Sequence, residues 1–146
     1  MSPITVTTDV NRSAEHVFAY ATDASRFKEW QEGVVEGHME SCGAVVPGTR
    51  CVTTRRIGGA TRPATSEVTR INPPRTWGVR GIEGPIRATV DLTVEPLTPA
   101  SSRLTISVDF AGHGIGRVLV PLIVRRQAQK EMPANVARLK QRVESE

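Results

Sequence analysis

The spacing of apolar residues changes once along this chain, and that change constrains the fold more than any other feature. From residue 86 to residue 95, apolar and polar side chains alternate, and they alternate again from residue 104 to residue 110. Alternation with a period of two is typical of a strand with one buried face. After residue 114, apolar residues recur at helical spacing until about residue 144. The sequence therefore predicts paired strands followed by one long C-terminal helix.

The N-terminal part predicts a different local order. Ile4 to Val10 alternates as a strand, and Ser13 follows as a potential N-cap residue. A first short helix is expected over residues 14–22. Asp23 can cap a second short helix, whose apolar side carries Phe27 and Trp30.

Turn residues divide the middle of the chain into further strands. The expected strands cover residues 34–41, 49–57, 60–71, 76–82, 86–95 and 104–110, with a loop over residues 96–102. Short turns between them favour an antiparallel meander. The sequence thus predicts an α+β fold in which a seven-stranded antiparallel sheet curls around the C-terminal helix. The two short helices follow the first strand, and residues 1–146 form a single domain.

Two prolines fall within the predicted C-terminal helix. Pro121 lies near its first turns, where proline is tolerated, but Pro133 lies in its interior. Proline has no N–H to donate and clashes with the preceding turn. We therefore expect Pro133 to kink the helix or to split it.

Charge and cysteine content exclude several classes of function. The net charge is +4 and aromatic residues make up 4%, which is a weak basis for nucleic-acid binding. Cys42 and Cys51 match no zinc-ligand spacing, so neither a metal nor a cofactor is expected. No apolar run is long enough to cross a bilayer, and the first residues are unlike a signal peptide. The expected protein is cytoplasmic, a monomer or a homodimer.

Several weak motifs occur in a characteristic order along nearly the whole chain. They are the opening stretch 10–20, Trp30, Val68–Arg75, Val94–Leu97, and a tail that begins at 121–126 and continues through 137–140. In this combination the sequence resembles the START-like, or SRPBCC, helix-grip superfamily, in its polyketide cyclase/dehydrase-like branch. That resemblance implies a cavity between the sheet and the C-terminal helix. The fold hosts lipid transfer, hormone binding, cyclisation, dehydration and co-chaperone roles, so it does not by itself assign an activity.

Five polar side chains, with Arg56 as the alternative to one of them, are candidates for the interior of such a cavity. Tyr20 could act as a general acid, and His38 could act as a base near neutral pH. Arg126 could anchor a ligand carboxylate or enolate, although a surface position is the simpler interpretation. Arg55 and Arg56 are consecutive, so alternation places one of them on the inner face without indicating which. Arg62 lies on the next predicted strand.

Apolar candidates come from the same predicted inner surface. The expected ligand-binding residues are Phe18, Trp30, Trp77, Leu92, Val94, Val108, Phe110, Val118, Leu119 and Leu122.

Three functions remain open at this point. The first is binding of a hydrophobic or amphipathic small molecule, such as a lipid, a polyketide or an aromatic metabolite. The second is a metal-independent polyketide cyclase or dehydratase, which would require at least two of Tyr20, His38, Arg55, Arg62 and Arg126 in one pocket. The third is a co-chaperone-like role of the outer surface.

Overall fold

The computed structural model describes residues 3–41, 43–57, 59–83, 86–112, 115, 117 and 123–146. Its strands are β1 (Ile4–Val10), β2 (Val34–Glu40), β3 (Arg50–Ile57), β4 (Ala60–Asn72), β5 (Thr76–Gly81), β6 (Ile86–Thr98) and β7 (Ser101–Gly112). The helices are α1 (Ala14–Ala21), the 3₁₀ helix η1 (Ala24–Glu29) and α3 (Arg125–Glu144). The predicted order of elements is confirmed.

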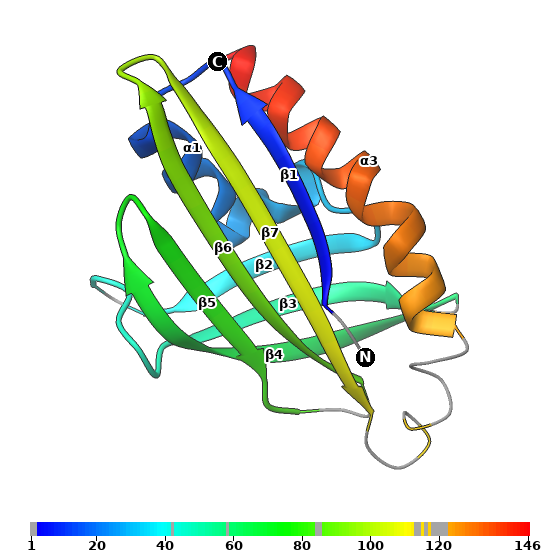
Figure 1. The fold of residues 1–146 in the computed structure, drawn as a ribbon. Coiled ribbons are helices and arrows are strands. Elements are labelled where there is room, and N and C mark those ends of the chain that lie inside the picture. The colour runs from blue at the N-terminus through cyan, green and yellow to red at the C-terminus, as the bar shows by residue number, and fades with distance from the viewer. Residues whose placement is uncertain are drawn as a thin grey trace.

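All seven strands join one antiparallel sheet, in the order β1-β7-β6-β5-β4-β3-β2. Consecutive strands therefore lie side by side from β2 to β7, and β1 pairs with β7. Figure 1 shows the curled sheet with α3 running alongside β1 and with α1 behind the sheet. The predicted α+β fold, with the sheet curled around the C-terminal helix, is confirmed.

Both short helices begin where the sequence predicts. The hydroxyl of Ser13 accepts a hydrogen bond from the backbone N–H of His16 at 3.2 Å, which caps α1. The carboxylate of Asp23 accepts one from the N–H of Ser25 at 3.0 Å and caps η1. The caps define where both helices begin, and the apolar sides of the helices are buried in the core through Phe18 and Phe27.

The core lies between the inner face of the sheet and α3. On α3, the residues Met132, Val136, Leu139 and Val143 are buried, at the spacing of one helix face. On the sheet, the pairs Leu92↔Ile106 and Val94↔Leu104 place four buried side chains opposite one another. Burial of this shared apolar surface holds the helix against the sheet.

The loop between β6 and β7 differs from the sequence prediction. The loop predicted over residues 96–102 is shorter, because β6 continues to Thr98 and β7 begins at Ser101. The pairing register shifts between Pro96 and Thr98, and such an irregularity allows a proline within a strand. Of the two outcomes expected at Pro133, a split does not occur, since α3 continues on both sides of the proline. The predicted start of the helix near residue 115 cannot be compared directly, because residues 118–122 lie outside the described residues.

Gly37 on β2 allows η1 to pack closely against the sheet. A Cβ atom at this position would lie 2.6 Å from the backbone oxygen of Ala24. We expect Gly37→Ala to lower the free energy of unfolding by about 1–3 kcal/mol, because the backbone must move to relieve that overlap. Chemical denaturation measures this loss. Gly43→Ala is the matched control, since a Cβ atom there meets nothing within 4 Å; equal losses in the two variants would contradict the packing argument.

Candidate functional site

A pocket with a cavity volume of about 300 Å³ lies between the inner face of the sheet and α3. Its walls come from η1 and the segment that follows it, from β3 to β7, and from the N-terminal half of α3. The N-terminal half of α3 and the sheet therefore leave space between them, whereas the C-terminal half of α3 packs into the core.

The wall formed by β5, β6 and β7 is apolar. Trp77 lies opposite Leu92, and Val79 lies opposite Val90, so all four side chains share one face of the sheet. Phe27 meets the rings of Trp30 and Trp77 edge-on, with centroids 5.9 Å and 6.2 Å away. These aromatic contacts fix a rigid, apolar wall.

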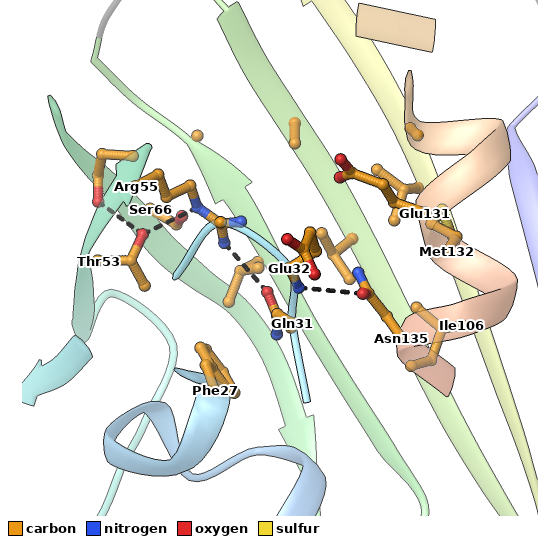
Figure 2. A pocket seen from close by; sticks show the side chains of 18 of the residues that line it. Phe27, Gln31, Glu32, Thr53, Arg55, Ser66, Ile106, Glu131, Met132 and Asn135 are labelled. Atoms are coloured by element: carbon orange, nitrogen blue, oxygen red, sulfur yellow. Dashed lines mark hydrogen bonds between the residues drawn. The ribbon is translucent and has the colours of Figure 1, made fainter. Parts of the chain in front are cut away.

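Polar groups enter the pocket from β3. Cys51, Thr53 and Arg55 alternate along this strand and all line the pocket, and the more exposed Arg56 lines it as well. Arg55 donates a hydrogen bond from Nε to the Thr53 hydroxyl at 3.1 Å, and another from Nη2 to Oε1 of Gln31 at 3.4 Å. Figure 2 shows its guanidinium projecting from β3 into the pocket. Burial of the guanidinium lowers the pKa of Arg55.

The opposite side of the pocket carries the polar face of α3 (Figure 2). The side-chain oxygen of Asn135 accepts a hydrogen bond from the N–H of Glu32 at 3.0 Å, and Arg138 donates one to the carbonyl of Trp30 at 3.2 Å. Both bonds join α3 to the segment between η1 and β2. Glu131 also lines this side and accepts a hydrogen bond from Gln127 at 2.8 Å.

Of the five polar candidates from the sequence, Arg55 lines the pocket and the other four do not. His38, Arg62 and Arg126 are exposed, on β2, β4 and α3 respectively. Tyr20 is buried on α1, where its hydroxyl donates to Glu29 at 3.0 Å. The guanidinium of Arg26 lies over the Tyr20 ring, 4.4 Å from its centroid. The structure thus places Tyr20 in a local polar cluster outside the pocket.

The environment of Tyr20 predicts an unusual alkaline titration. Burial, and then the hydrogen bond and negative charge of Glu29, raise the pKa of Tyr20 to about 12 from 10.0. The folded state therefore keeps the phenolic proton at pH values where the unfolded state has lost it, so stability should fall as pH rises from about 10 to about 12. Tyr20 is the only tyrosine, so the phenolate absorbance reports it alone. A folded protein that titrates near pH 10, like the chain in denaturant, would contradict this environment.

The apolar candidates divide into three groups. Trp30, Trp77, Leu92, Val108 and Phe110 line the pocket. Phe18 and Val94 are buried in the core and do not line it. Val118, Leu119 and Leu122 lie outside the described residues.

Several polar pocket residues were missed by the sequence reasoning: Gln31, Thr53, Ser66, Gln127, Glu131 and Asn135. Only Thr53 had a usable signal, since it lies two residues before Arg55 on the same strand. The others occur in polar stretches of the sequence, where the pattern does not indicate whether a side chain faces the pocket or the solvent.

Cys51 also lines the pocket as a free, buried thiol. Burial raises its pKa to about 11, so the thiol stays protonated near neutral pH and is a poor nucleophile. Among the described residues, no three His, Cys, Asp or Glu side chains gather closely enough to hold a metal ion.

The sequence of the chain matches a known protein family. The family model described as polyketide cyclase/dehydrase and lipid transport matches residues 1–144. The chain belongs to this family. No curated protein matches the sequence.

Solved structures show the same fold at low sequence identity. A START superfamily protein from Mycobacterium smegmatis is 16% identical, with a TM-score of 0.79 and 99% of each chain covered. The Zhui aromatase/cyclase from Streptomyces sp. R1128 is 14% identical, with a TM-score of 0.73 and coverage of 97% of this chain and 94% of that one. The di-domain ARO/CYC BexL from the BE-7585A biosynthetic pathway is 16% identical, with a TM-score of 0.75. The match covers 99% of this chain and 47% of BexL. At such identities the likeness concerns the fold alone.

Proposed function

We propose that this protein binds a hydrophobic or amphipathic small molecule in the pocket between the sheet and α3. The observation that carries the proposal is the rigid apolar wall of aromatic and aliphatic side chains around a cavity of about 300 Å³. A concave, mostly apolar cavity with a few convergent polar groups is the usual form of a small-molecule site. A lipid, a polyketide or an aromatic metabolite has the chemistry to fill it.

The two tryptophans make this proposal directly measurable. Trp30 and Trp77 are the only tryptophans in the chain, and both line the pocket. Any ligand that enters should therefore change the intrinsic fluorescence.

The experiment is a fluorescence titration with fatty acids, fatty alcohols and polycyclic aromatics, supported by native mass spectrometry of the freshly purified protein. We expect saturable changes in tryptophan emission and a stoichiometry of one ligand per chain. If no member of the panel binds and the freshly purified protein carries no ligand, the proposal is wrong.

A cofactor-free cyclase or dehydratase acting in the same pocket is the alternative function, and it has less support. Its requirement was that at least two of five polar side chains point into one pocket, and only Arg55 lines it. The neighbouring thiol of Cys51 is held protonated by burial. Proton transfer to and from a bound substrate needs an acid and a base within reach of the same ligand.

The remaining expectations concern partners and location. In the part of the chain that the structure describes, no helix is long and apolar enough to cross a membrane. A cytoplasmic location, a monomeric or homodimeric state, and the absence of nucleic-acid binding and of any metal or cofactor are retained as predictions.

A further inference from the structure

Arg55 lines the pocket with a partly buried side chain and forms no ion pair with a carboxylate. None of the ion pairs formed by the described residues includes it. Its hydrogen bonds go to two neutral oxygen atoms, one on Thr53 and one on Gln31. A positive charge is therefore held at the wall of a largely apolar cavity without an ion-pair partner among the described residues.

Such an arrangement costs free energy in the empty protein. Moving a charged group out of water is unfavourable unless an opposite charge or several hydrogen bonds compensate for it. A guanidinium has five N–H groups, and the two hydrogen bonds of Arg55 use only two of them. The depressed pKa of Arg55 has the same physical origin.

We propose that Arg55 binds the acidic head group of the ligand, and that the physiological ligand is an amphipathic organic anion with a carboxylate or a similarly acidic oxygen. This inference rests on the proposed function, because it assigns the ligand class of the same pocket. The planar guanidinium can donate two parallel hydrogen bonds to a carboxylate. The ligand would thus supply an ion-pair partner, which Arg55 does not have among the described residues.

The charges around the pocket also define the orientation of this ligand. Arg56 lines the pocket next to Arg55 on β3, whereas Glu131 lines the opposite side from α3, where Figure 2 shows it. Two other lining carboxylates each lie near an arginine: Glu32 is 3.7 Å from Arg138, and Glu83 is 4.0 Å from Arg50. The carboxylate of Glu131 disfavours an anionic head group on the α3 side. The head group is therefore expected at β3, beside Arg55, with the apolar part against Trp77, Leu92 and Val108.

The test compares ligands that share one apolar chain and differ only in the head group. Dodecanoate, dodecanol and dodecyltrimethylammonium, each kept below its critical micelle concentration, are titrated against the wild-type protein and followed by tryptophan fluorescence. We expect dodecanoate to bind most tightly. In Arg55→Met, its affinity should fall by about 10- to 100-fold, the range typical of a charged hydrogen bond, while that of dodecanol changes by less than about threefold.

Arg80→Met is the matched control. Arg80 follows the pocket-lining Val79 on β5, so alternation places it on the opposite face of the sheet. It is exposed and does not line the pocket, so its loss changes the net charge equally. Dodecanoate should bind this variant as it binds the wild type. Equal weakening in both variants, or equal weakening of dodecanoate and dodecanol in Arg55→Met, would overturn the inference.

The comparison of head groups in the wild type decides the matter if Arg55→Met does not fold. Binding of dodecanol or of the cation as tightly as dodecanoate would overturn the role of Arg55 and leave the proposed binding function intact. Failure of all three ligands to bind would overturn the proposed function and this inference together.

Discussion

We expect the Leu139→Arg variant to be unfolded already at ordinary temperatures, so that its thermal melt shows no cooperative transition. The Leu139 side chain is 0% exposed and lies on the buried face of α3, between Val136 and Val143. An unpaired charge buried there costs several kcal/mol, a large part of the ~5–15 kcal/mol that stabilises a typical domain. Thermal melts followed by circular dichroism measure the effect.

Ala137→Arg is the control for this prediction. Ala137 lies on the same helix and is exposed, so the same substitution should change the free energy of unfolding by less than about 0.5 kcal/mol. A Leu139→Arg variant that melts like the wild type would mean that α3 does not pack on the sheet as described.

Ala128→Phe should prevent ligand uptake without unfolding the protein. Ala128 lines the pocket from α3, and a phenyl ring at this position would occupy part of a cavity of about 300 Å³. We expect the affinity for dodecanol to fall at least about tenfold, which corresponds to about 1.4 kcal/mol. Because the ring fills space that is empty in the free protein, the melting temperature should stay close to that of the wild type.

The same substitution at Ala137 provides the comparison. The Ala137 side chain is exposed on α3, so Ala137→Phe should bind dodecanol with wild-type affinity. If Ala128→Phe binds dodecanol as well as Ala137→Phe does, the ligand does not occupy the pocket.

The fold could be predicted from the sequence because its signals are local and repeated. Alternation in β6 and β7 and helical spacing from Met132 to Val143 each arise from one buried face, and the structure buries those faces. When one long helix follows a sheet with one apolar face, packing the helix against that face is one of few arrangements that bury the apolar surfaces of both elements. The loop between β6 and β7 was predicted too long because Pro96 was taken as the end of the strand, whereas a register shift accommodates it.

The pocket was harder to predict than the fold. Its polar side chains on β3 come from a segment without clear alternation, so the sequence does not show which of them point inward. On β3, Cys51 and Val52 are consecutive and both apolar, so the pattern did not indicate which of Arg55 and Arg56 faces inward. In the structure both arginines line the pocket, a result that alternation along the strand does not predict.

Tyr20 illustrates a different limit. Its place on the buried face of α1 followed from helical spacing, but that face also meets η1, where Glu29 accepts its hydrogen bond. Whether a buried tyrosine faces a cavity or a neighbouring helix depends on how two helices pack, and the sequence carries no direct signal for that. Gln31 and Asn135 belong to the same class, since each lines the pocket through contacts between distant segments.

The most direct test of the central claim is a crystal structure of the protein grown with dodecanoate. The account predicts electron density for the alkyl chain between α3 and the inner face of the sheet, against Trp77 and Leu92, with the carboxylate within hydrogen-bonding distance of Arg55. Density for the ligand elsewhere on the protein, or a pocket closed by its own side chains at saturating dodecanoate, would contradict it.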